Sequence, residues 1–235
     1  MNRPQTRITI SIITVLLLFS GFGSLALAES ATNCHCFKDR SYNPAKPFAA
    51  DDYILATAFN SFVSKAFNIP KKEIVMLKMK QGVGQNDLLI GLKIAATTGV
   101  DLKELLSQRK QGKSWSAIIS DPAMNESLQK NPLLQSIKSE ISMDQAAAEV
   151  ADQSLANFFS IPIETIRKIK TSGLNEKELA LVFILAHAGE QNPETLVSQF
   201  KKDGKSWSAI AKGIGINPQA AGELILQFPD KKLPR

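Results

Sequence analysis

The densest group of chemically reactive side chains in this sequence is the tripeptide Cys34-His35-Cys36. It contains both cysteines of the chain and one of its two histidines. Thiolate sulfur and imidazole nitrogen bind soft transition metals, and two neighbouring thiols can also interconvert between the dithiol and the disulfide. The segment therefore predicts either a metal site or a disulfide.

The spacing of these three residues excludes some of the possible metal and cofactor sites. Covalent haem attachment needs Cys-x-x-Cys-His, and neither the order nor the spacing fits. A closed zinc site needs four ligands in a tetrahedron, which three adjacent residues cannot supply by themselves. A soft metal ion such as Cu(I) remains a hypothesis if a partner chain completes the ligand set, and a Cys34–Cys36 disulfide is the alternative in an oxidising compartment. Apart from this metal hypothesis, the sequence predicts no cofactor.

Residues 1–28 predict a signal peptide. Arg3 and Arg7 precede an uncharged apolar run, and Ala26-Leu27-Ala28 has the small-residue pattern of a cleavage site. The alternative is a retained N-terminal membrane anchor, because residues 8–28 carry no charge and are long enough to span a bilayer. The cleavage site favours export to the periplasm or beyond. Removal of the two arginines would lower the net charge from +6 to +4.

The residues that follow carry a resemblance to a protein group. Cys-His-Cys-Phe at residues 34–37 is followed by Arg40-x-Tyr42-x-Pro44 and then by Ala-Ala-Asp-Asp-Tyr at residues 49–53. This order resembles a group of uncharacterised exported bacterial proteins, over about the first sixty residues. The resemblance implies no activity, ligand or catalytic residue.

A seven-residue sequence, Gly-Lys-Ser-Trp-Ser-Ala-Ile, occurs at residues 112–118 and again at residues 204–210, and it contains both tryptophans. In each copy the glycine can end one helix in a left-handed conformation, and the first serine can cap the next helix. We expect the tryptophans to be buried in corresponding sites. The predicted anchors of the repeat are Gly112, Ser114, Trp115, Gly204, Ser206 and Trp207.

The sequence around the two copies predicts an all-α fold made by tandem duplication of a small multi-helix module. Apolar residues recur at helical spacing, and the shares of 44% apolar and 21% charged residues are those of an ordinary globular protein. Whether the modules share one core stays open. After the signal peptide we expect an extended arm over residues 29–50, a first module over 51–121, a connector with a short helix over 122–141, a second module over 142–229 and a polar tail over 230–235.

Local signals mark the helix ends in each module. In the first module, Asp51 or Asp52 is expected to cap the first helix, and Asn86 or Asp87 is expected to open the apolar third helix. Pro70 suits the first turn of the second helix, because proline has no N–H to lose there.

Three patterns that suggest other functions each lack a required part. A phosphate loop needs a glycine five residues before Gly-Lys-Ser, and Ser107 and Gln199 stand there instead. Residues 207–224 have the spacing of a DNA-binding helix-turn-helix, but the second helix carries almost no basic residues. His187, alone on an apolar helix, is expected to be a hydrogen-bonded core residue.

No catalytic constellation of Ser, His and acidic residues is found in the sequence. A net charge of +4 permits contact with anionic surfaces but does not indicate nucleic acid. We therefore expect an exported, non-catalytic helical protein of the cell envelope with a binding or structural role, whose partner is an envelope protein or an anionic surface component. The alternative is a periplasmic metal-binding or thiol-redox protein that acts through Cys34, His35 and Cys36.

Overall fold

The protein is represented by a computed structural model, which describes residues 37–124, 131–139 and 141–228. Over these ranges the regular elements are all helical, as the sequence predicts, and there is no strand. In the same ranges we find no helix with the length and hydropathy needed to cross a membrane. The helices are α1 (Asp51–Phe67), α2 (Lys71–Lys80), α3 (Gln85–Thr98), α4 (Leu102–Lys110), α5 (Trp115–Ile119), α7 (Pro132–Lys138), α8 (Met143–Phe159), α9 (Ile163–Lys170), α10 (Glu176–Ala188), α11 (Pro193–Lys201), α12 (Trp207–Gly213) and α13 (Ala221–Leu224), with 3₁₀ turns at Pro122–Met124 and Ile225–Gln227.

Helices α1 to α5, the first half, follow the same order as helices α8 to α12, the second half. α1 ends at Asn68 and α8 at Ser160, and both residues are left-handed, with φ of 52° and 54°. Pro70 and Pro162 then directly precede α2 and α9. Residues of α1 and α2 correspond to those 92 positions later, and residues of α3 and α4 to those 91 positions later. The similarity is what the duplication hypothesis expects.

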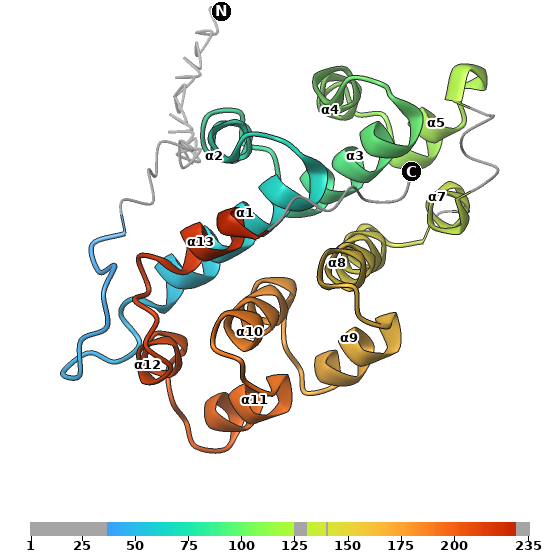
Figure 1. Ribbon diagram of the computed structural model, residues 1–235. Helices are drawn as coiled ribbons and strands as arrows, with labels where there is room; N and C mark the ends of the chain where they lie inside the picture. The colour runs from blue at the N-terminus through green and yellow to red at the C-terminus, as the bar shows by residue number, and fades with distance from the viewer. Residues whose placement is uncertain (1–36, 125–130, 140, 229–235) are drawn as a thin grey trace, which may run out of the picture. The chain divides into compact units, whose positions relative to one another are not determined.

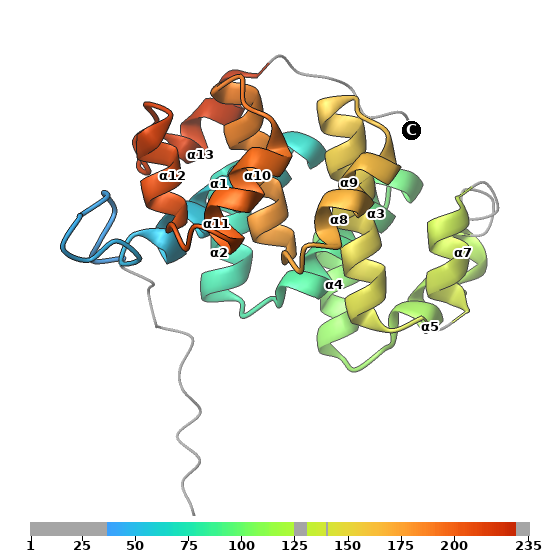
Figure 2. The ribbon, with the colours of Figure 1, turned by 90° about the horizontal axis from the view of Figure 1, so that it is seen from below.

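The first helix of each half packs mainly on the third helix of the other half. α1 packs mainly on α10 of the second half, and α8 packs mainly on α3 of the first half (Figures 1 and 2). α13, near the end of the described chain, lies along α1. The buried apolar side chains of both halves form one continuous cluster. The halves therefore share one core.

The repeated segment has the same local structure in both places. Gly112 and Gly204 have positive φ values of 90° and 66°, a conformation that glycine adopts without steric cost. Ser114 and Ser206 are the N-caps of α5 and α12, and the Oγ of each accepts a hydrogen bond from a backbone N–H three residues later. The predicted helix stop and serine cap are confirmed.

Both tryptophans are buried, as predicted. Trp115 is 4% exposed and Trp207 is 1% exposed. The indole N–H of Trp115 donates to Asp87 Oδ1 at 2.8 Å, and that of Trp207 donates to Glu178 Oε1 at 3.5 Å. Asp87 and Glu178 occupy corresponding positions in the first turns of α3 and α10. Each tryptophan thus joins its own short helix to the apolar helix of its half.

The predicted caps of α1 and α3 are wrong. The N-caps are Ala50 and Gly84, and neither helix has a side-chain cap. The Asp51 carboxylate accepts the backbone N–H groups at the start of α12, and Asp87 accepts the indole N–H of Trp115. In both cases the acid binds a donor outside its own helix, because tertiary packing brings that donor within reach.

Of the arm predicted over residues 29–50, the structure describes residues 37–50, and these are not extended throughout. Its last part, residues 44–50, consists of consecutive turns that lead into α1. The Ser208 hydroxyl donates to the Pro47 carbonyl at 2.8 Å, so these turns rest on α12. The two prolines of the arm make turns here instead of a continuous extended segment. The predicted short helix of the connector is confirmed as α7.

Candidate functional site

The tripeptide Cys34-His35-Cys36 lies outside the described residues, so the metal and disulfide hypotheses both remain predictions. Among residues 37–124, 131–139 and 141–228, no three His, Cys, Asp or Glu side chains gather into a group that could hold a metal ion.

His187 does not lie in the core, so the prediction made for it is wrong. It occupies the last turn of α10, where its side chain is exposed, and its ring centroid lies 4.5 Å from that of Phe228. The buried part of α10 ends at Ala186, one residue earlier. The histidine therefore lies at the margin of the core between two aromatic rings, edge-on to Phe228 and tilted against Phe159 with centroids 6.0 Å apart.

Two adjoining recesses lie beside α2 and α4 in the first half. One has a volume of about 320 Å³ and the other about 310 Å³, and Glu73 and Lys103 line both. We call the two together the α2–α4 groove. Its apolar lining comprises Phe67, Ile69, Leu92, Ala95, Ala96 and Leu102 in the first recess, and Pro70, Met76 and Leu77 in the second.

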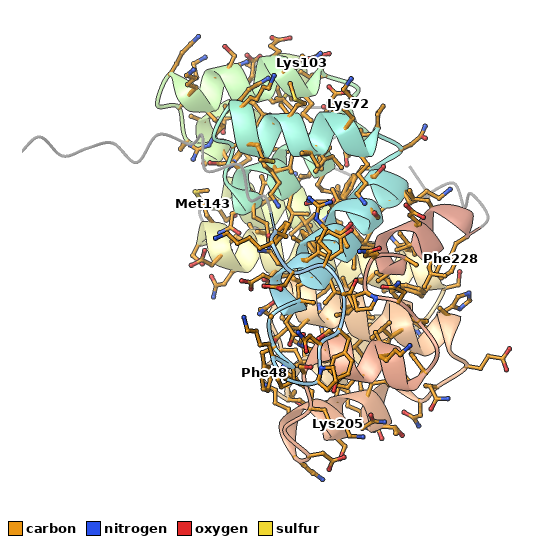
Figure 3. All side chains as sticks on the ribbon, turned by 90° about the vertical axis from the view of Figure 1, so that its left-hand side faces the viewer. Phe48, Lys72, Lys103, Met143, Lys205 and Phe228 are labelled. Carbon is orange, nitrogen blue, oxygen red and sulfur yellow. The ribbon has the colours of Figure 1, made fainter. Side chains whose placement is uncertain are left out.

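Basic side chains stand beside this apolar lining. Figure 3 shows Lys72 on α2 and Lys103 on α4 at the same side of the chain. Lys103 Nζ lies 3.6 Å from Glu73 Oε1, and the Lys103 side chain is 69% exposed. An ion pair this exposed contributes little to stability, so it can open without much cost. The groove therefore offers an apolar surface and two lysines to a partner.

The corresponding place in the second half is bridged by a different ion pair. Met76 corresponds to Lys168 of α9, and Lys103 corresponds to Glu194 of α11. Lys168 Nζ and Glu194 Oε1 are 2.8 Å apart. Their hydrogen bond and mutual attraction raise the pKa of Lys168 and lower that of Glu194. Each half thus has an exposed ion pair between its second and fourth helices, Glu73 with Lys103 in the first half and Lys168 with Glu194 in the second.

The halves differ again where the first two helices of each half meet. Lys78 Nζ donates to the amide oxygen of Asn60 at 3.0 Å. At the corresponding positions, Lys170 Nζ donates to both carboxylate oxygens of Asp152, each at 2.9 Å. Burial of Lys78, and then the positive charge of Lys177, lower the pKa of Lys78 to about 8. Burial raises the pKa of Asp152 and outweighs the opposite effect of Lys170.

Sequence reasoning missed these differences because it used the repeat only to find similar residues. Reading the two copies position by position would have exposed them: Met76 stands opposite a lysine, Lys103 opposite a glutamate, and Asn60 opposite an aspartate. The distances within each pair follow from the helix packing and have no signal in the sequence.

Comparisons with protein-family models, with curated proteins and with solved structures find no match to this chain.

Proposed function

We propose that the protein is an exported, non-catalytic component of the cell envelope that binds an acidic segment of another envelope protein. The observation that carries the proposal is the α2–α4 groove, an apolar recess with Lys72 and Lys103 in its lining. The predicted signal peptide supports the location.

The occupant follows from the chemistry of the groove. An apolar lining binds apolar side chains by removing their surface from water. Lys72 and the exposed Lys103 can attract carboxylates, and α2 as a whole contains four lysines against the single acid Glu73. The acids in the lining already have partners: Glu73 pairs with Lys103, and Asp101 accepts backbone N–H groups at the start of α4. A polypeptide that alternates acidic and apolar residues fits both properties.

Site-specific photo-crosslinking tests the proposal. A photoreactive residue replaces Met76 in one variant and Lys168 in a matched control, and each protein is exported in its native cells before irradiation. We expect a discrete adduct with an acidic envelope protein from position 76 and none from position 168. The adduct should disappear when Lys103→Glu is added. Equal adducts from both positions, or none from either, would contradict the proposal.

The alternative function, metal binding or thiol redox chemistry at Cys34, His35 and Cys36, makes a separate prediction. It expects stoichiometric metal in the natively exported protein, or a Cys34–Cys36 pair that cycles at a mild potential. Thiol titration and metal analysis measure both. If the protein acts through the groove, a Cys34→Ser and Cys36→Ser double variant keeps the crosslink from position 76.

A further inference from the structure

A recess of about 190 Å³ lies beside Trp115 in the first half, and it shares no lining residue with the α2–α4 groove. Trp115, Ser116, Met143 and the basic residue Arg109 line it. The rest of the lining is mainly apolar and includes Ile90, Ile137, Ile141 and Ala146. The recess therefore offers a small ligand an apolar wall and a cation.

The corresponding place in the second half contains a carboxylate. The matching residues, 92 positions apart, are Met143 with Asp51, Trp115 with Trp207 and Ser116 with Ser208. The oxygens of Asp51 accept the backbone N–H groups of Trp207 and Ser208, each at 2.9 Å. In the first half a methionine replaces this acid, and the N–H groups of Trp115 and Ser116 have no acceptor among the described residues.

Arg109 gives the first half a positive charge that the second half lacks at this place. Its Cζ lies 5.3 Å from the centroid of the Trp115 ring, where the second half has Phe200 stacked on Trp207. Its Nη2 donates to Met143 Sδ at 3.5 Å. Thioether sulfur is a weak acceptor, so a carboxylate oxygen would be the stronger partner for this donor.

The acids near the recess do not exclude an anion. Asp87 pairs with Arg109 Nε at 2.9 Å, but the guanidinium has further N–H donors. Asp144 accepts a side-chain amide N–H at 2.6 Å. Asp144 corresponds to Asp52, so the second half has the carboxylate of Asp51 beside the same neighbouring acid.

We propose that this recess binds a short-chain aliphatic carboxylate, which takes the place that Asp51 has in the second half. The carboxylate accepts the backbone N–H groups of Trp115 and Ser116, Arg109 balances its charge, and its chain lies against the isoleucines. Hydrogen bonds to an ionised acceptor are about twice as strong as neutral ones. Met143 lies at the surface at the start of α8 and is 38% exposed (Figure 3), so its unbranched side chain can move aside for the ligand.

The test is titration of the ¹⁵N-labelled full-length protein with sodium butanoate, followed by ¹H–¹⁵N NMR. We expect saturable shifts of the Trp115 and Ser116 amide signals. The amides of Trp207 and Ser208 should not respond, because Asp51 already occupies their site. Butanamide, which has the same shape without the charge, should bind at least about tenfold more weakly, because it forms no charge-assisted hydrogen bond.

Met143→Asp gives the decisive comparison, because it installs the carboxylate of the second half. An acid in the first turn of a helix is favourable, so this variant should fold, and circular dichroism checks that it does. It should weaken butanoate binding at least about tenfold, whereas Met143→Leu, which keeps the apolar wall, should bind as the wild type does. The absence of a saturable shift in the wild type, an equal response to butanamide, or undiminished binding by Met143→Asp would overturn the proposal.

Discussion

Asp51 links the start of α1 to the start of α12, and its removal should destabilise the fold by an amount that can be worked out. Its two carboxylate oxygens accept the backbone N–H groups of Trp207 and Ser208, each at 2.9 Å, so α1 supplies the capping acceptor for a helix far away in the chain. Loss of an N-cap acceptor costs about 1 kcal/mol. Hydrogen bonds to a charged acceptor contribute about 1.5–3 kcal/mol each.

Desolvation offsets part of this gain. Burial raises the pKa of Asp51 despite the two hydrogen bonds, so the penalty of burying the carboxylate is the larger effect on its ionisation. We therefore expect Asp51→Ala to lower the free energy of unfolding by about 1–2 kcal/mol, near the upper range for a lost cap. For a chain of this size, that corresponds to a fall of about 2–8 °C in the midpoint of thermal unfolding.

Urea unfolding followed by tryptophan fluorescence measures the effect, because both tryptophans are buried. Asp52→Ala is the matched control: it removes the neighbouring acid, which is exposed, and should cost about 0.5 kcal/mol or less. Asp51→Asn keeps one oxygen acceptor and should fall between the two. Equal losses for Asp51→Ala and Asp52→Ala would show that the link contributes nothing and would refute the reasoning.

Three further predictions concern packing and ionisation. Trp115→Ala and Trp207→Ala should each cost about 3–5 kcal/mol in chemical denaturation, as large core truncations do, and a cost below about 1 kcal/mol at both sites would rule them out as anchors. Gly222→Ala should cost about 1–3 kcal/mol of stability, because its Cβ would lie 2.6 Å from a threonine hydroxyl of α1. Gly213→Ala is the control: its Cβ would meet nothing within 4 Å, so it should be neutral or stabilising. Similar melting temperatures for the two variants would contradict this prediction. The pKa of Lys78 is about 8 in the folded protein and 10.5 in the unfolded chain, so between these pH values the unfolded chain binds more protons. The free energy of unfolding should therefore rise with pH from about 8 to 10.5. Lys78→Met should flatten this rise in urea titrations at pH 7.5 and pH 9.5, and parallel changes in both proteins would show that Lys78 is not its source.

Signals within a few residues of each other made most of the helices predictable. The positions of Pro70 and Pro162 mark where second helices begin, and the glycine and serine of the repeat give a stop and a cap, all of which depend on local backbone geometry. Asp51 shows where this reasoning fails. An acid before an apolar run is the usual signal for a cap, but which helix it caps depends on which N–H groups the tertiary structure brings near.

The candidate site was less predictable for the same reason. A helical pattern reveals that α1 and α10 each have an apolar face, but it does not say that these two faces meet across the halves. The groove is lined by residues between 67 and 103 of the first half, and which of their side chains face it depends on how these helices pack. The sequence places Met76 opposite a lysine of the second half, but it does not show that this methionine lines a recess.

The packing of α1 on a helix of the other half also determines when the chain can fold. The apolar face of α1 is covered by α10, so it stays exposed until the ribosome has made the residues between 67 and 188. Contacts so distant in sequence form slowly, because a long loop must close before they contribute any stability. Such a delay suits the export that we propose, because a chain that is still unfolded can pass through a membrane channel.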